Sequence, residues 1–267
     1  SSTHNPYLKI HSMLHSPSTS KQTVFNLFFI GLIASIACIG CFKTDDVETV
    51  IPEDPTTGFD FLVPDRAFGE YMLFLGINGV QERLDTLTSG AVQVNYYLNP
   101  DLVTGVNSLQ LSKTSGSVAA LEAAGVATAS QKISDLSGVE FFSGLDTLVL
   151  TSNDLTELDL TNNITLLELS MNFCKVETLD ITLCPLLQKL RFRGSSQAEN
   201  LLQSIDLSQN VALRHLHLRS HNFTSIDLTN NVQLIEEIDL SSNPGPDGDS
   251  NTGDIVIPTE IYNNVQG

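Results

Sequence analysis

Positively charged residues are scarce in this sequence, and their scarcity excludes one class of partner. The 267 residues include 13 Lys and Arg against 31 Asp and Glu, a formal net charge of −18. The first 41 residues hold two lysines and no carboxylate, so the rest of the chain has 11 basic and 31 acidic residues, or −20. A surface this acidic repels phosphate backbones. We therefore expect no nucleic acid among the partners.

Cysteine and the motifs of catalysis are also sparse. Two of the four cysteines, Cys38 and Cys41, lie in an N-terminal apolar run, which leaves Cys174 and Cys184 and excludes a disulfide scaffold. The sequence has no glycine-rich phosphate loop, no zinc-type spacing of Cys and His, and no definable set of nucleophile, base and orienting residue. We therefore expect a protein that is not an enzyme and needs no cofactor.

A long apolar run near the N-terminus predicts insertion into a membrane. It extends from Val24 to Phe42 and follows a polar stretch that contains Lys21. Translation from Met13 would give a short basic region before the apolar one, as in secretory signals. In that case residues 1–12 would lie outside the translated protein.

The end of this run resembles the lipobox of bacterial lipoproteins, because Gly40 precedes Cys41. The resemblance implies that Cys41 is acylated and becomes the new N-terminus, although Cys38 and Ile39 depart from the residues usual in such boxes. The following segment, residues 43–46, is similar to the acidic signal that sends some Gram-negative lipoproteins to the cell surface. We therefore expect a lipid-anchored protein of the bacterial cell envelope, at the outer membrane surface. The alternative is an uncleaved transmembrane anchor, since a run of about 19 residues can span a bilayer.

Beyond the anchor, the sequence predicts a tether, a cap and a repeat array. Residues 42–59 are acidic and contain proline without apolar periodicity, as flexible tethers do. Asp65 is the expected N-cap of a short helix and Gly76 its expected stop. The expected parts are the signal region 1–41, the tether 42–59, the cap and first strand with an insertion 60–132, the repeats 133–243, and a C-terminal loop and cap 244–267.

Apolar residues recur with a period of about 21 residues through the second half of the chain. The successive sets are Leu145, Leu148 and Leu150; Leu166, Leu169 and Met171; Leu187, Leu190 and Phe192; after an insertion, Leu213, Leu216 and Leu218; and finally Leu234, Ile238 and Leu240. An offset second motif, such as Leu158-Asp159-Leu160, lies within each unit. Apolar residues that skip one position fit an extended segment with alternate side chains inward. Each unit should therefore be a flattened coil with strands or extended segments on both sides.

The pattern from Leu145 to Asn163 resembles the nested 21-residue class of leucine-rich repeats in bacterial surface proteins, and residues 63–79 are similar to the cap that precedes such arrays. The resemblance covers residues 60–243 in outline and is strongest from residue 133. It implies a leucine-rich-repeat solenoid of parallel β coils with a short N-terminal helical cap, used for recognition. The segment from Ser115 to Gln131 departs from the pattern, and we leave open whether it is a helix or a mobile insert.

Polar residues should form ladders at the two turns of each coil. Asn153 recurs as Cys174, Ser195, His221 and Asn243, and Asn163 recurs as Cys184, Asn210 and Asn231. Such inward side chains are expected to bond backbone groups that would otherwise be unpaired. Cysteine is small and a weak donor, so we interpret both cysteines as ladder residues. We expect no disulfide between them, because they lie on opposite turns of one coil.

Two acidic features are candidate metal sites. Oxygen ligands alternate in the loop Asp247, Asp249, Asn251 and Asp254, as in calcium loops, but the spacing is not that of an EF-hand. The alternative there is a solvated turn. The column Asp159, Asp180, Asp206 and Asp227 should stack on one outer face. The hydroxyls of Thr161, Thr182, Ser208 and Thr229 can donate to this column, which favours a structural ladder over a stripe of divalent ions.

The outward positions of the first strand in each coil hold a basic patch. We call these six residues the basic patch: Lys189, Arg191, Arg193, His215, His217 and Arg219. Alternate residues of adjacent strands share one face, so we predict a site for an anionic group of a protein, peptide or glycan. The alternative is local neutralisation by Glu168 and Glu237. The predicted function is surface recognition, and its alternative is a passive structural lipoprotein of the periplasm.

Overall fold

The computed structural model describes residues 58–194 and 202–245. The chain divides into two compact units, residues 1–52 and 53–267, and every described residue lies in the second unit. The predicted signal region with Cys41 and the calcium candidates between Asp247 and Asp254 therefore lie outside the described residues. Within the described ranges, no helix is both long enough and apolar enough to cross a membrane.

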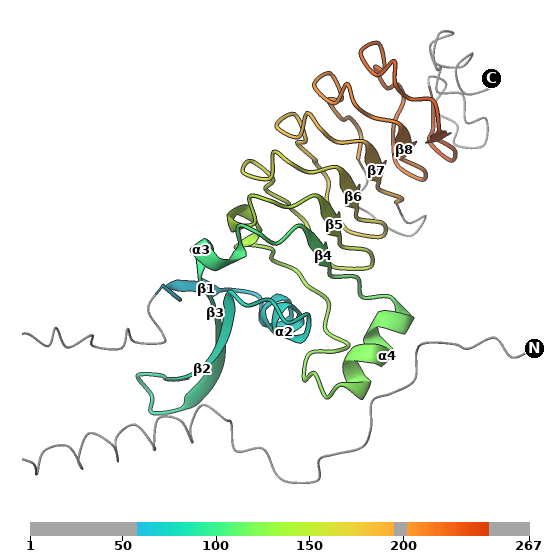
Figure 1. Ribbon diagram of the computed structural model, residues 1–267. Helices are drawn as coiled ribbons and strands as arrows, with labels where there is room; N and C mark the ends of the chain where they lie inside the picture. The colour runs from blue at the N-terminus through green and yellow to red at the C-terminus, as the bar shows by residue number, and fades with distance from the viewer. Residues whose placement is uncertain (1–57, 195–201, 246–267) are drawn as a thin grey trace, which may run out of the picture. The chain divides into compact units, whose positions relative to one another are not determined.

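The N-terminal cap packs one helix on a small antiparallel sheet (Figure 1). Strands β1 (Phe61–Val63), β3 (Val92–Leu98) and β2 (Val80–Thr86) are neighbours in that order. Helix α2 (Arg66–Phe74) begins as predicted, because the Asp65 side chain accepts a hydrogen bond from the Phe68 backbone N at 3.0 Å. The chain leaves the helix through Gly76, whose φ of +72° favours glycine. The helical cap is confirmed, and the antiparallel sheet adds to it.

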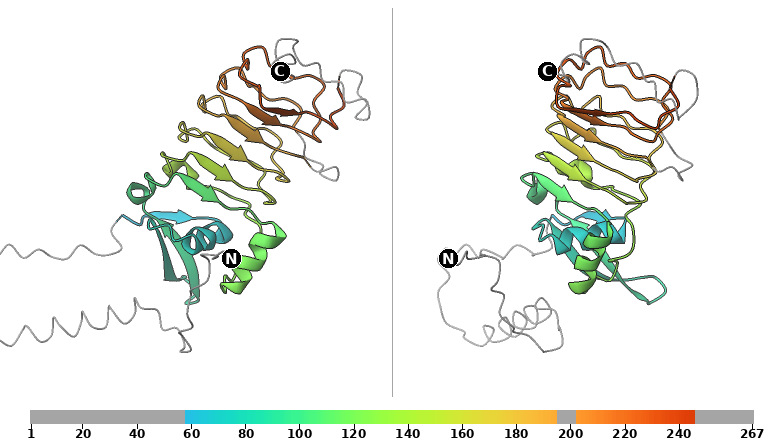
Figure 2. Two further views of the ribbon diagram at one scale, coloured as in Figure 1. Left: turned by 45° about the vertical axis from the view of Figure 1, so that its right-hand side comes forward. Right: turned by 90° about the vertical axis from the view of Figure 1, so that its right-hand side faces the viewer.

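A parallel sheet of six strands forms one side of a leucine-rich-repeat solenoid (Figures 1 and 2). Its strands follow chain order: β4 (Ser108–Gln110), β5 (Thr147–Val149), β6 (Glu168–Ser170), β7 (Lys189–Arg191), β8 (His215–His217) and β9 (Glu237–Asp239). The middle residues pair across the sheet: Leu109, Leu148, Leu169, Leu190, Leu216 and Ile238. The predicted register is therefore confirmed from β5 to β9.

The core lies between this sheet and the opposite side of each coil. The leucines of the repeat period are buried almost without exception, and many, such as Leu169, Leu190 and Leu216, have no exposed surface. The offset motif on the opposite side is extended chain, without strands in the described residues. Each coil therefore buries apolar side chains against the coils before and after it.

Polar ladders close both turns, as predicted for the ladder residues other than Ser195, which lies outside the described residues. The Asn153 side-chain nitrogen donates to the backbone oxygens of Leu111 and Leu150, each at 2.8 Å, and its oxygen accepts from Ile133 N at 3.0 Å. At the next position in this column, Cys174 Sγ donates to Leu150 O at 3.3 Å. The same column continues to Asn243, so coils are joined by side chains as well as by strands.

The alanine- and serine-rich segment left open by the sequence contains helix α4 (Ser115–Ala123), which begins at the N-cap Thr114. It buries only Leu121 among its own residues. Two shorter elements complete the junction with the first coils, α3 (Pro100–Val103) and the 3-10 helix η1 (Val139–Phe141).

Buried polar groups fasten the cap to the first coils. Asp65 Oδ2 accepts from the Ser134 backbone N at 2.7 Å, and Glu70 Oε2 accepts from the Thr128 backbone N at 2.7 Å. Nearby, the buried Lys113 Nζ donates to the backbone oxygen of Thr128 at 3.2 Å. Charged groups in a low dielectric are stable only with such partners. The cap and the first coils are thus one continuous structure.

Candidate functional site

The basic patch occupies the outward face of strands β7 and β8. Lys189 pairs in register with His215, and Arg191 with His217, while Leu190 and Leu216 between them point into the core. Because alternate residues share one face and adjacent strands lie about 4.8 Å apart, these four side chains are neighbours. All four are partly buried. The predicted grouping of residues is therefore present in the structure.

An acidic residue on the preceding strand balances the first two cations. Glu168 of β6 lies 3.2 Å from Lys189 Nζ through Oε2 and 3.4 Å from Arg191 Nη1 through Oε1. This cross-strand arrangement is the local neutralisation that the sequence left as an alternative. A partner that binds Lys189 or Arg191 must therefore compete with Glu168.

Two further carboxylates face the histidines. Glu236 Oε2 lies 2.5 Å from His215 Nε2, and Glu236 Oε1 accepts from Arg214 Nη1 at 2.9 Å. Glu237 Oε2 lies 3.0 Å from His217 Nε2, although the two atoms are not aligned as a hydrogen bond. Sequence reasoning anticipated Glu237 but missed Glu236, because Glu236 lies before β9 and outside the alternation of its strand.

The remaining cations, Arg193 and Arg219, lack this balance. They lie beside one another at the ends of β7 and β8, where Gly194 N donates to Arg219 O at 2.9 Å. Neither side chain forms an ion pair within the described residues. Arg219 Nε is buried and has no hydrogen-bond partner in that part of the chain. The positive charge of the patch that no carboxylate balances therefore lies on Arg193 and Arg219. We call these two residues the arginine pair.

An aromatic ring supports one of these arginines. The Arg193 guanidinium carbon lies 5.6 Å from the centre of the Phe173 ring, within the range of a cation–π contact. Phe173 has a φ of +62° and is 42% exposed. Its equivalents in other coils, Ser152, Ser220 and Ser242, also have left-handed backbones. A bulky residue is uncommon in this conformation, so Phe173 is a strained residue at the edge of the patch.

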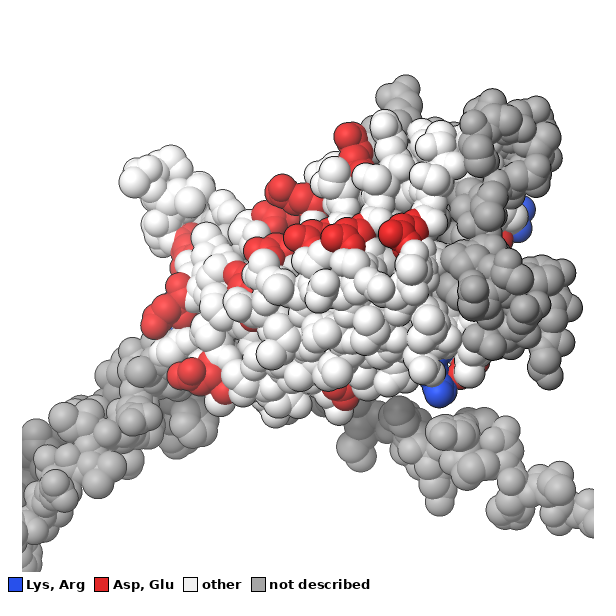
Figure 3. Space-filling model, turned by 90° about the horizontal axis from the view of Figure 1, so that it is seen from above, with Lys and Arg blue, Asp and Glu red and all other residues white. Residues whose placement is uncertain are grey.

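The aspartate column forms local turns. Thr182 donates to Asp180 through both its backbone N at 2.9 Å and its hydroxyl at 2.6 Å, and Thr229 contacts Asp227 in the same way. These hydroxyl bonds lower the pKa of Asp180 and Asp227. Figure 3 shows a row of acidic side chains crossing the coils. Among the described residues, no group of three or more His, Cys, Asp and Glu is arranged to hold a metal ion.

The two cysteines of the folded unit lie inside the solenoid. Burial raises the pKa of Cys174 to about 12 and that of Cys184 to about 11. Both thiols are free and buried. They are therefore unreactive ladder groups, as predicted from their positions.

The buried histidine of the same column, His221, also acts as a ladder residue. Its Nε2 lies 2.7 Å from Phe192 O, and its Nδ1 accepts from the Leu202 backbone N at 3.3 Å. Since Nδ1 accepts, the proton is on Nε2 and the ring is neutral. Burial lowers the pKa of His221 and outweighs the hydrogen bond to Phe192.

Comparisons with known proteins find similar solved structures but no sequence family. No family model matches the chain, and a search of curated proteins finds no match. The chain is similar to the functional domain of InlJ from Listeria monocytogenes, which includes a cysteine ladder, with 27% identity and a TM-score of 0.38 over 55% of this chain and 32% of that one. It is also similar to the internalin InlF from Listeria monocytogenes strain 4b F2365, with 17% identity and a TM-score of 0.37 over 67% of this chain and 50% of that one. The chain thus spans half or less of each of these structures.

Proposed function

We propose that this protein is a recognition module that binds an anionic group of a protein, peptide or glycan on the outward face of β7 and β8. The observation that carries the proposal is the arginine pair, two arginines at adjacent backbone positions without ion-pair partners in the described residues. They lie on a chain whose net charge after residue 41 is −20. A concentrated positive site on such a chain favours anions locally and repels them elsewhere.

The chemistry of the site selects the class of ligand group. Two planar guanidinium groups on adjacent coils can hold carboxylate, sulfate or phosphate oxygens in paired hydrogen bonds. The exposed Phe173 ring beside Arg193 offers an apolar contact for the atoms next to the anionic group. A partner with several anionic groups could also displace Glu168 from Lys189 and Arg191. We therefore infer that the full basic patch binds an acidic peptide segment or an acidic glycan.

The test begins with a panel of acidic peptides and sulfated glycans, each beside its neutral counterpart. Bound probes should be anionic, and their affinity should fall as salt rises, because salt screens partly exposed charges. The double variant Arg193→Ala with Arg219→Ala should weaken binding at least about tenfold. The control is Lys132→Ala with Lys175→Ala, which also removes two positive charges, from a cluster around Asp154.

Salt also separates ligand binding from local charge balance. Binding that is indifferent to salt would assign His215 and His217 to local contacts with Glu236 and Glu237.

We also propose that the protein is held at the cell envelope by acylation of Cys41, with recognition at the outer membrane surface. The support is the lipobox-like Gly40-Cys41 at the end of an apolar run and the acidic residues that follow it. Mass spectrometry of the membrane fraction should find a lipid-modified Cys41 and no segment that precedes it. An intact, unmodified segment spanning residues 24–42 would instead establish the uncleaved transmembrane anchor.

The second candidate function is a passive structural lipoprotein of the periplasm. The neutralisation of Lys189 and Arg191 by Glu168 favours it, because a patch balanced within the chain needs no ligand. Protease treatment of intact cells separates the two candidates. Cleavage on intact cells supports surface recognition, whereas protection that ends on lysis supports the periplasmic role.

A further inference from the structure

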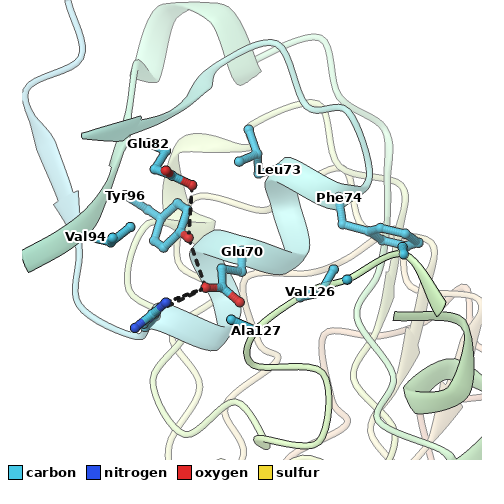
Figure 4. A pocket seen from close by; sticks show the side chains of 11 residues that line it. Glu70, Leu73, Phe74, Glu82, Val94, Tyr96, Val126 and Ala127 are labelled. Atoms are coloured by element: carbon cyan, nitrogen blue, oxygen red, sulfur yellow. Dashed lines mark hydrogen bonds and ion pairs between the residues drawn. The ribbon is translucent and has the colours of Figure 1, made fainter. Parts of the chain in front are cut away.

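The cap contains a hollow that belongs to neither the basic patch nor the solenoid core. It has a volume of about 420 Å³ and lies between α2, the β2–β3 hairpin and the segment after α4 (Figure 4). Leu73 and Phe74 of α2, Val94 of β3 and Val126 form much of its apolar wall. Leu73 and Phe74 are 40% and 42% exposed, although they belong to the helix that packs on the sheet. The hollow is therefore an open apolar surface of the size that accommodates small ligands and side chains.

The charged residues of the hollow differ in the number of hydrogen bonds and ion pairs that they form. Glu70 is saturated, because Oε1 accepts from Arg66 Nη2 at 2.9 Å and Tyr96 Oη at 3.0 Å, while Oε2 accepts from Thr128. Burial is the largest single influence on the pKa of Glu70 and raises it. The hydrogen bonds together outweigh burial, so the pKa of Glu70 is lowered. Glu70 is thus a buried, ionised carboxylate that serves the structure of the cap.

Glu82 is exposed and has only a long hydrogen bond. Its Oε2 lies 3.4 Å from Tyr96 Oη, but a phenol has one proton, and the shorter contact of Tyr96 is to Glu70. Figure 4 shows the three groups in a row, Glu82, Tyr96 and Glu70, along one side of the hollow. Because Glu82 is exposed and its hydrogen bond is long, its carboxylate can pair with a cation or N–H donor that enters the hollow. Arg66, the cation of this wall, is already engaged by Glu70.

The apolar surface continues beyond the hollow along the hairpin. Val94 pairs with Leu84 and Val92 with Thr86, on the same face of the sheet as the pair Glu82 and Tyr96. Leu84 is 69% exposed and Val92 63%, and no described residue covers them. A ligand that covered this surface would be longer than the hollow itself. Glu82 therefore lies between two apolar surfaces. This arrangement is complementary to an extended peptide that carries a cationic side chain between apolar ones.

We propose that the cap hollow binds an extended peptide segment that carries lysine or arginine between apolar residues. The cationic group pairs with Glu82, and the flanking apolar side chains cover Leu84 and Val92 on one side and Leu73 and Phe74 on the other. The three charged residues that line the hollow, Arg66, Glu70 and Glu82, have a net charge of −1. The acidic chain as a whole also attracts cationic segments. This site is separate from the anionic ligand site of the basic patch.

The test uses the full chain and three peptides that differ only in the central side chain: acetyl-Leu-Lys-Leu-amide, acetyl-Leu-norleucine-Leu-amide and acetyl-Leu-Glu-Leu-amide. Calorimetric titration should show the lysine peptide binding about three- to fivefold more tightly than the norleucine peptide, the factor expected of one partly exposed ion pair. The glutamate peptide should bind most weakly. Amide chemical shifts should change at Val94 and Val126.

Two variants locate the effect. Glu82→Gln keeps the size of the side chain and should remove the preference for lysine, whereas Glu157→Gln, at an exposed position of the array, should retain it. Leu84→Ser should weaken all three peptides alike, and circular dichroism checks that each variant is folded. Equal affinity for the three peptides, a lysine preference that survives Glu82→Gln, or the absence of binding at millimolar peptide would each overturn the proposal.

Discussion

Truncating Leu190 to alanine probes whether the coils are cooperative units. Leu190 has no exposed surface and lies in register between Leu169 and Leu216, which are also fully buried. Backbone hydrogen bonds hold the neighbouring strands, such as that from Met171 N to Arg191 O at 2.8 Å, so the site cannot easily collapse around the lost atoms. A leucine-to-alanine change then costs both transfer free energy and a cavity, about 3 to 5 kcal/mol in a rigid site.

Urea unfolding provides the measurement. Circular dichroism follows the whole fold, and tyrosine fluorescence follows the cap, where the tyrosines of the described residues lie: Tyr71, Tyr96 and Tyr97. Coincident midpoints would justify a two-state free energy of unfolding. Leu183→Ala, in the preceding coil and at a 52% exposed position, is the matched control and should cost about 0.5 kcal/mol or less. Equal costs for Leu183→Ala and Leu190→Ala would refute the register of the coils.

Three further predictions concern the ladders and the edge of the patch. Burial lowers the pKa of His221 in the folded protein. The stability that the neutral ring contributes is therefore complete above the pKa of the unfolded chain, about 6.5, and is lost as the pH falls below that value. His221→Asn should flatten the fall in melting temperature between about pH 7 and 5. Cys174 and Cys184, with raised pKa values, should resist alkylation at pH 8 until urea unfolds the chain, as peptide mass spectrometry can show, and rapid native labelling would contradict their ladder role. Phe173→Asn should relieve left-handed strain and leave stability equal or higher by up to about 1 kcal/mol in thermal unfolding, while weakening anion binding through Arg193; a clear loss of stability would show that the ring is structural.

The repeat architecture could be predicted because a 21-residue period identifies the equivalent strand positions in successive coils. Leu148, Leu169 and Leu190 alternate with outward residues, and a shift of one position would turn these leucines to solvent. The cap sheet was harder to predict. In β2 the side chains on both faces include polar ones, and their partners become visible only when β2 pairs with β3, as when Tyr97 donates to Asp85 at 2.6 Å.

The candidate site was predictable in its membership but not in its charge balance. Alternation along each strand placed Arg191 and His217 on one face, and the structure confirms that grouping. Which cations keep a free charge depends on rotamers and on turn residues such as Glu236, which follow no period. The contact of Arg193 with Phe173 likewise depends on a phenylalanine with a left-handed backbone, at a position that is serine in three other coils.

The central claim, recognition through the arginine pair, is tested most directly by comparing two double variants on the anionic probe panel. We expect that bound probes are acidic peptides or sulfated glycans. Arg193→Ala with Arg219→Ala should weaken their binding at least about tenfold, whereas Lys132→Ala with Lys175→Ala should not. Binding confined to neutral probes, or equal losses in the two double variants, would contradict it.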